Sequence, residues 1–400
     1  MDTEAQLSPL AHQVEKFKYI SFTAPEFRTD VEGLIASQSQ WTAIESRTVA
    51  ERPYREFFGT TDRLARSLAL GAIPDVPAGR DITERIAGLL LEPRLSRSTA
   101  EEFFDPDARN LDRIGRAVGA GEPVRIVLPS FPGRPHNLAT HRRVAPDLSE
   151  AAALARLALI AQRITAIYPP SVIWVIVLDG IAYAPFYGYA LEGARQYPRD
   201  LRSMIHALGY SRHFELLDLQ ALIDERRAEY DGLRGEVVAE VEAQWSDPEY
   251  LFRDDLIRSM RLGTDTSAAA SALIQIMKQG NPRTGLDAVF DSIDEAVSHS
   301  ARRTAFEYMV MLTTIKRMDI ILDRVPGALR GTLHPKPGQI APRLTQPTTD
   351  IAPWHGVAIV DTDGAVSTVY ESFVYQHVKD FTAVYVEGDY EPFYFESRHC

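Results

Sequence analysis

The chain has 400 residues, of which 45% are hydrophobic and 24% charged, values that are ordinary for a globular protein with a buried core. Its formal net charge of -12 argues against nucleic acid or an anionic membrane as a partner, because an acidic surface repels both. Its single cysteine, Cys400, excludes a disulfide within the chain and a cysteine-based metal site.

The amino-terminal region, residues 1–120, is expected to be mainly helical. Its first ten residues carry acidic side chains and no apolar run, and no window of the chain is apolar enough to span a bilayer, so a cytoplasmic protein is expected. Asp81–Leu91 spaces its apolar side chains at the helical period, and Ser98 to Glu102 is typical of a helix start. Gly119–Glu122 interrupts the pattern.

Residues 121–221 predict an α/β core. The apolar run 123–128 predicts a buried strand, 147–167 a helix, and Ser171–Leu178 a central parallel strand that is apolar on both faces. A helix over Pro198–Leu208 and a further α/β stretch over Glu215–Ala221 follow. Ligands of parallel sheets gather beyond the carboxyl ends of the strands, so the loop Ser130–Asn137 and Asp179 are expected at one edge.

Residues 222–327 predict a large helical elaboration, interrupted at Asn281-Pro282. Residues 328–400 predict a β-rich segment that completes the core, with Asp361–Gly364 as a hairpin turn. Its strands are expected over Ala328–Leu333, Ile340–Leu344, Gly356–Val360, Val366–Phe373 and Ala383–Val386. The fold class is therefore α/β.

Three groups of polar side chains are candidates for chemistry. The first follows the first core strand and suits a phosphate or carboxylate, although a solvated loop with ordinary salt bridges explains it as well; its members are Ser130, Arg134, His136, Asn137, Arg142 and Arg143. Asp179 ends the strongest strand, where it either orients an amine or acts as a base, or simply begins a turn. His334, Lys336 and His355 suit proton transfer to a carbonyl compound, although a lone histidine is more often structural.

Several well-known motifs are missing from the sequence. It contains no GxGxxG, GxxxxGK[ST], GxSxG or CxxC pattern, so the usual marks of nucleotide cofactors, P-loop chemistry and serine hydrolases are absent. The spacing of His334 and His355 is not that of a helical zinc motif, which makes a metal site a weak interpretation.

A set of short motifs, taken in order, resembles the pyoverdine/dityrosine biosynthesis family, the isocyanide (isonitrile) synthases. The resemblance covers about residues 110–360 and is carried by Val127–Pro132, Asn137, Pro146-Asp147-Leu148 with Glu150, Ile167–Pro170, Asp179-Gly180, Tyr197 with Leu201–Ile205, Leu333–Pro335, Arg343-Leu344 and Pro353–Val357. Each motif is weak alone, whereas the order and spacing of the set are fairly specific.

The resemblance implies a Rossmann-like core and a reaction between the α-amine of an L-amino acid and ribulose 5-phosphate, whose C2 carbon becomes the isonitrile carbon. It implies small-molecule substrates, no metal or organic cofactor, and an Fe(II)/2-oxoglutarate oxygenase as a pathway partner. The catalytic candidates that follow from it are Asp179, His334, His355 and Arg134. The substrate-binding candidates are Ser130, His136, Asn137, Arg142, Arg143, Tyr183, Lys336 and Arg343.

The sequence departs from the family pattern at a few of these positions. Arg134 stands where the family loop usually has a lysine, and an arginine cannot form a Schiff base. Ile181 and Pro185 stand where the family usually has an arginine and an aspartate that would flank the amino-acid pocket. A divergent member with a less polar or non-aromatic amino-acid substrate is therefore expected. The alternatives are other C–N chemistry on an amino acid or phosphosugar, a non-catalytic ligand-binding homologue, and a metal hydrolase.

Overall fold

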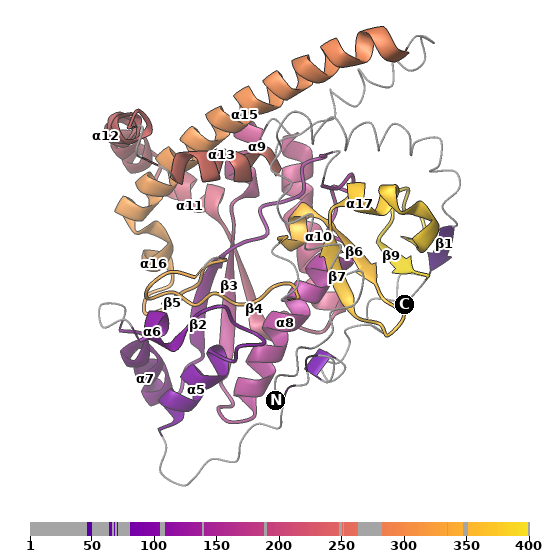
Figure 1. Ribbon diagram of the computed structural model, residues 1–400. Coiled ribbons are helices and arrows are strands. Elements are labelled where there is room, and N and C mark those ends of the chain that lie inside the picture. The colour runs from indigo at the N-terminus through magenta and orange to yellow at the C-terminus, as the bar shows by residue number, and fades with distance from the viewer. Residues whose placement is uncertain are drawn as a thin grey trace.

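Two β-sheets with one long helix between them organise the protein (Figure 1). The computed structural model describes residues 46–49, 64–65, 68, 70, 81–104, 109–137, 140–187, 190–247, 250, 252–262, 282–333, 335–346 and 351–398. The first sheet is the α/β core, and the second is built almost wholly from the carboxyl-terminal part of the chain.

The core sheet has the strand order β4 (Phe214–Asp218), β3 (Val172–Leu178), β2 (Val124–Pro129) and β5 (Leu329–Arg330), and all neighbours are parallel. Helix α8 (Leu148–Thr165) connects β2 to β3, so the predicted βαβ unit is confirmed. Parallel pairing places the carboxyl ends of β2, β3 and β5 at one edge, where ligands of such sheets bind.

The strand β3 is buried on both faces, as its unbroken apolar sequence predicts. Trp174 and Ile176 belong to the core on the α8 side, where the Trp174 indole N–H donates to the Leu157 carbonyl at 2.9 Å. Val175 and Val177 belong to a second apolar cluster, formed with the helices on the opposite face. Sheets covered on both faces need such continuous apolar strands.

The described amino-terminal helices begin and end where the sequence signals predict. In α5 (Ile82–Leu90), Asp81 is the N-cap and accepts a hydrogen bond from the Thr83 amide. In α6 (Ala100–Phe103), Thr99 and Glu102 form a capping box, which satisfies backbone N–H groups at the helix start. The next helix, α7 (Asn110–Ala120), ends at Gly121, whose φ of 68° is the left-handed conformation that favours glycine.

Helices dominate the region between β4 and β5, as predicted. They are α11 (Leu219–Glu225), α12 (Arg227–Trp245), α13 (Phe252–Leu262), α15 (Pro282–Met318) and α16 (Ile320–Arg324). The long α15 begins at Pro282 and packs against α9 (Gly180–Tyr187), the helix that follows the carboxyl end of β3 (Figure 1). Across the part of the chain that the structure describes, no helix is both long and apolar enough to cross a membrane.

The helix α10 (Leu191–Ala207) begins earlier than predicted, because Pro198 lies inside it and does not start it. Ala194, Tyr197 and Leu201 are buried on one side of this helix. Their packing stabilises the turns on both sides of the proline, which by itself disfavours a helix interior.

The second sheet has the order β1 (Ser46–Val49), β8 (Phe381–Val386), β9 (Tyr394–Ser397), β6 (Val357–Val360) and β7 (Val366–Val369). Among the described residues of 328–400, β5 joins the core sheet, whereas β6, β7, β8 and β9 form the second sheet, which packs against α8. The strand β1, from the region expected to be helical, pairs with β8. The predicted hairpin between β6 and β7 is confirmed, with Gly364 at a φ of 80° in its turn.

Some predicted strands in this segment are shorter than expected. The strand predicted over Val366–Phe373 ends at Val369, and helix α17 (Glu371–Gln376) begins there, since the Glu371 amide donates to the Thr140 carbonyl at 2.8 Å. The strand predicted over Ile340–Leu344 makes only isolated bridges, from Ile340 to Gly331 and from Pro342 to Ser96.

Candidate active site

A cavity of about 470 Å³ lies at the carboxyl edge of the core sheet. Pro129, at the end of β2, and Gly331 to Leu333, just after β5, form one of its walls. Its volume is in the range of small-molecule sites. Larger hollows of about 610 and 580 Å³ lie between α5 and α7 and beside the amino end of β4, away from this edge.

The lining of the cavity combines apolar side chains with polar and cationic ones. Its polar members are Arg97, Tyr308, Thr332, Lys336, Gln339, Thr345, His355 and Tyr370. Among the described residues that line it, none is an aspartate or a glutamate. In a protein with a net charge of -12, this cavity therefore favours an anionic ligand.

The cavity brings together two of the predicted residues, His355 and Lys336. His355 ends the short helix η4 (Pro353–His355), and burial together with the Arg134 charge lowers its pKa to about 4. The imidazole is therefore neutral near pH 7, with one nitrogen that donates and one that accepts. His334, the other predicted histidine, lies outside the described residues.

Asp179 lies at the same edge, between the end of β3 and the first residue of α9. Burial raises the pKa of its carboxyl to about 7, and the Tyr183 hydroxyl offsets part of this rise. Its Oδ1 is shielded from solvent and has no hydrogen-bond partner among the described residues. A carboxyl that titrates near neutral pH is suited to accepting and returning a proton.

Two tyrosines lie near Asp179. Tyr183 lies on α9, one turn after Asp179, and its backbone N–H donates to the Asp179 carbonyl at 3.0 Å. Tyr308, on α15, lines the cavity, and its ring centroid is 5.1 Å from that of Tyr183. Tyr183 was predicted as a substrate-binding residue, but it is Tyr308 that lines the cavity.

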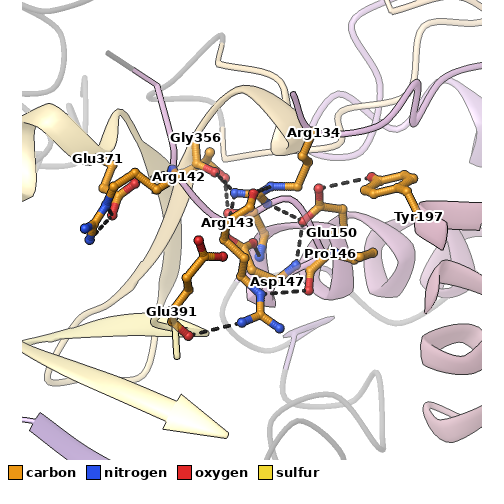
Figure 2. A network of polar contacts seen from close by, with 12 residues as sticks. Arg134, Arg142, Arg143, Pro146, Asp147, Glu150, Tyr197, Gly356, Glu371 and Glu391 are labelled. Atoms are coloured by element: carbon orange, nitrogen blue, oxygen red, sulfur yellow. Dashed lines mark hydrogen bonds and ion pairs between the residues drawn. The ribbon is translucent and has the colours of Figure 1, made fainter. Parts of the chain in front are cut away.

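Arg134 is fully buried and its guanidinium is held by internal partners (Figure 2). Its Nη1 pairs with Glu150 at 2.7 Å, and its Nη2 pairs with Asp147 at 2.9 Å and donates to the Gly356 carbonyl at 2.5 Å. Its Nε donates to the Arg143 carbonyl at 3.1 Å. Burial lowers the pKa of Arg134, but the negative charges of Asp147 and Glu150 raise it by more. The pKa of Arg134 therefore lies above its ordinary value.

The Arg134 contacts join the amino end of α8 to the segment that carries His355. Asp147 is the N-cap of α8, and Glu150 completes its capping box and accepts from the Tyr197 hydroxyl at 3.1 Å. A planar fork of donors reaches several partners at once, which the single ammonium of a lysine does not. The arginine at this position therefore has a structural explanation, and it does not face the cavity.

The other predicted arginines also have internal partners, and none of them lines the cavity. Arg142 binds Glu371 through its Nε at 2.9 Å and contacts the Tyr375 hydroxyl. Arg143 pairs with Asp389 at 2.8 Å and donates to the Glu391 carbonyl at 3.1 Å (Figure 2). Arg343 donates to the carbonyls of Pro93 and Ser96 at 2.9 and 3.0 Å. These contacts tie the second sheet and the amino-terminal helices to the core.

The other predicted residues of the loop after β2 are Ser130, His136 and Asn137, and the contacts of Ser130 and Asn137 hold the loop in place. Ser130 is buried and donates to the Leu128 carbonyl at 3.3 Å. Asn137 donates to the Arg261 carbonyl at 3.2 Å, and the Nδ1 of His136 is shielded from solvent. Phe131 packs against Trp354 with ring centroids 5.1 Å apart. The loop therefore contacts the segment before His355 through the packing of Phe131 on Trp354.

The positions expected to flank the amino-acid pocket, Ile181 and Pro185, lie on α9. Ile181 packs against Ala184 and Ala194, and neither Ile181 nor Pro185 lines the cavity. Within the described residues, no three His, Cys, Asp or Glu side chains gather as a metal site would require.

Sequence reasoning missed Arg97 and Tyr308. Arg97 reaches the cavity because its backbone N–H donates to the Ala341 carbonyl at 2.7 Å, a contact between distant parts of the chain. Tyr308 lies on a helix without any recognisable motif. Neither residue has a local sequence signal.

Comparison with known proteins agrees with the expected relationship. The profile of the pyoverdine/dityrosine biosynthesis protein family matches residues 114–380. An L-tyrosine isonitrile synthase from Pseudomonas aeruginosa is 26% identical over 278 residues, covering 68% of this chain and 80% of that protein. Isocyanide synthase A from Aspergillus fumigatus is 26% identical over 299 residues, covering 72% of this chain and 46% of that protein.

A solved structure shows the same fold. The PvcA protein from Pseudomonas aeruginosa superposes with a TM-score of 0.60 at 21% identity, and the match covers 79% of this chain and 100% of that one. The predicted α/β class is thereby confirmed. The profile match spans well over half of the sequence, and the chain belongs to the pyoverdine/dityrosine biosynthesis protein family, as its motifs predicted.

Proposed function

We propose that this chain is an isocyanide synthase, which condenses the α-amine of an L-amino acid with ribulose 5-phosphate. The observation that carries the proposal is the cavity at the carboxyl edge of the core sheet, whose described lining has cations, a neutral histidine and no carboxylate. The names of the relatives from Pseudomonas aeruginosa and Aspergillus fumigatus support the isonitrile chemistry.

The cavity residues suit the groups of a phosphosugar. Arg97 and Lys336 line the cavity and offer positive charge for the phosphate. His355, neutral near pH 7, donates a hydrogen bond to the ketone oxygen as the amine attacks. Asp179, with a pKa of about 7, takes up the proton that imine formation and enolisation release.

The side chain of the amino acid binds against the apolar residues of the lining. These include Leu312, Leu333, Leu344, Ile351 and Trp354. We therefore expect a less polar or non-aromatic side chain on the substrate, whereas the relatives from Pseudomonas aeruginosa and Xenorhabdus nematophila are named for L-tyrosine.

The test is incubation of the protein with ribulose 5-phosphate and a panel of L-amino acids, followed by mass spectrometry. An isocyanide synthase yields a product that has gained one carbon and lost two hydrogens relative to the amino acid. Thermal stabilisation by a substrate without product would contradict the proposal and favour a ligand-binding homologue. A different mass change would indicate other C–N chemistry.

Neutralising the cations of the cavity is expected to weaken phosphosugar binding. Each of the substitutions Lys336→Gln and Arg97→Gln should raise the KM for ribulose 5-phosphate about 10- to 100-fold, since a hydrogen bond to a charged group contributes roughly 1.5–3 kcal/mol. The KM for the amino acid should change little. Steady-state kinetics with each substrate varied in turn measures both.

Lys379→Gln is the matched control, because Lys379 is exposed in η5 (Val378–Asp380) and does not line the cavity. An equal rise in both KM values, or a rise in the Lys379→Gln variant, would argue against a phosphate site at Arg97 and Lys336.

A further inference from the structure

We infer that Tyr308 and Tyr183 form a proton relay that connects substrate in the cavity to the buried carboxyl of Asp179. The inference rests on the proposed function, because it names the route by which that site moves protons. Tyr308 is then the group that touches substrate, Tyr183 the intermediate carrier and Asp179 the terminal acceptor.

The placement of the three side chains supports this route. Tyr308 lines the cavity, whereas Tyr183 and Asp179 do not. Tyr183 is 2% exposed and packs in the apolar cluster between the core sheet and the helical elaboration. Its ring lies 5.1 Å from that of Tyr308, at an interplanar angle of 30°. Asp179 precedes Tyr183 by one helical turn. The ring contact therefore offers a route from the cavity toward Asp179.

The Tyr183 hydroxyl acts on both of its neighbours. Burial raises the pKa of Asp179 and of Tyr308, and in both cases the Tyr183 hydroxyl lowers it in part. Asp179 also acts on Tyr308, because a carboxylate charge nearby raises the pKa of the phenol further. These effects indicate that the Tyr183 hydroxyl lies near both the Asp179 carboxyl and the Tyr308 hydroxyl.

The pKa values of Tyr308 and Asp179 indicate which group carries the proton and which accepts it. Burial keeps the pKa of Tyr308 well above its ordinary value, so the phenol stays neutral and cannot hold a negative charge as a base. Asp179, with a pKa of about 7, is the group that changes protonation in the working range. A neutral phenol that passes one proton as it accepts another connects the substrate to a base that does not contact it.

The proton balance of the step is simple. The C–H or N–H bond of the substrate breaks, and its proton goes to the Tyr308 oxygen. The Tyr308 O–H proton moves to the Tyr183 oxygen, and the Tyr183 O–H proton moves to the Asp179 carboxylate. Both tyrosines end as neutral phenols with rotated hydroxyl groups, and Asp179 ends as a carboxylic acid. No electron leaves the substrate, and the reverse sequence returns the proton to a later intermediate.

Breaking either link is expected to lower kcat while leaving substrate binding intact. Tyr308→Phe and Tyr183→Phe should each reduce kcat by about 100-fold or more, with KM values close to those of the wild type, because positioned proton transfer contributes roughly 10²–10⁴-fold. The double variant should be no slower than either single variant, since the residues act as one unit. Steady-state kinetics of all three variants measures this.

Tyr230→Phe is the matched control. Tyr230 lies on α12, in the same apolar cluster as Tyr183, but it does not line the cavity. It is expected to keep the wild-type kcat. Multiplicative losses in the double variant, or a Tyr308→Phe variant with an altered KM and a normal kcat, would overturn the relay and leave Tyr308 as a binding residue.

A second measurement does not depend on turnover. The infrared band of the Asp179 carboxyl, identified by its loss in Asp179→Asn, is followed against pH, and its wild-type midpoint is expected near 7. Tyr183→Phe should shift the midpoint upward, because it removes the hydroxyl that stabilises the carboxylate, while Tyr230→Phe should not. An unchanged midpoint in Tyr183→Phe overturns the relay. If the wild type makes no isocyanide from any amino acid, the proposed function fails, and the infrared titration still decides the inference.

Discussion

Asp179→Asn is expected to abolish isocyanide formation while the fold remains intact. The substitution keeps the shape of the side chain and removes the group at this edge of the core sheet that titrates near neutral pH. The loss in kcat should be about 10²–10⁴-fold, the contribution of a positioned proton acceptor. Circular dichroism and product formation, measured on the same preparation, test the two parts of the statement.

The pH dependence gives this prediction a distinct signature. The base form of Asp179 accumulates as the pH rises through about 7, so wild-type kcat should rise over the same range, and the residual rate of Asp179→Asn should not. The folded carboxyl keeps its proton to a higher pH than the unfolded one, whose pKa is 3.8. The folded state therefore binds more protons between these values, and wild-type stability falls with rising pH.

The difference between the thermal midpoints of Asp179→Asn and the wild type should accordingly shift in favour of Asp179→Asn as the pH rises from 4 to 7, the interval between the two pKa values. The matched control is Asp231→Asn, since Asp231 is an exposed carboxylate on α12 with a loose ion pair of 3.8 Å to Arg227. Near-normal turnover in Asp179→Asn would refute the assigned role of the carboxyl.

Arg134→Met is expected to destabilise the protein by about 3–5 kcal/mol, because it leaves buried carboxylates without their cation. Asp147 and Glu150 would keep their places at the amino end of α8, and the Gly356 carbonyl would lose its donor. The free energy of unfolding from urea denaturation measures the effect. Burial raises the pKa of Glu150, so protonation at low pH relieves part of the cost and the defect should be smaller at pH 5 than at pH 8.

The control for this variant is Arg125→Met. Arg125 pairs with Glu215 at 3.4 Å, but both side chains are more than one third exposed, and such surface pairs contribute about 0–1 kcal/mol. The loss of unfolding free energy in Arg134→Lys should lie between those of Arg134→Met and Arg125→Met, because the lysine keeps the charge but lacks the planar guanidinium. A loss below about 1 kcal/mol in Arg134→Met would show that the network around Arg134 is not a structural element.

The core of the fold could be predicted because its signals are local. The strand β3 is apolar at each of its positions, and the start of α8 is marked by Asp147 with Glu150 three residues later. The second sheet was not foreseen as a separate layer, since strand partners are chosen by long-range packing. The change from β7 to α17 likewise depends on Glu371, which meets Arg142 and Thr140 from a distant part of the chain.

A site residue could be located from the sequence only where the order of strands and helices fixes its position. Asp179 follows a parallel strand and therefore lies at the ligand-binding edge, as expected. The arginines of the loop after β2 carry the right charge, but a sequence does not show that Glu150, Glu371 and Asp389 reach them in the folded protein. Arg97 was missed for the converse reason, since nothing near it in sequence marks it as part of a cavity.

One residue that lines the cavity lies outside the part of the chain that the family profile matches. Arg97 lies between α5 and α6, ahead of residues 114–380, the portion that the family shares. The shared portion supplies the sheet edge, Asp179 and His355, while the anchor to Ala341 brings an amino-terminal segment against them. A substitution in this upstream stretch would therefore change the lining of the cavity without altering the carboxyl ends of the core strands.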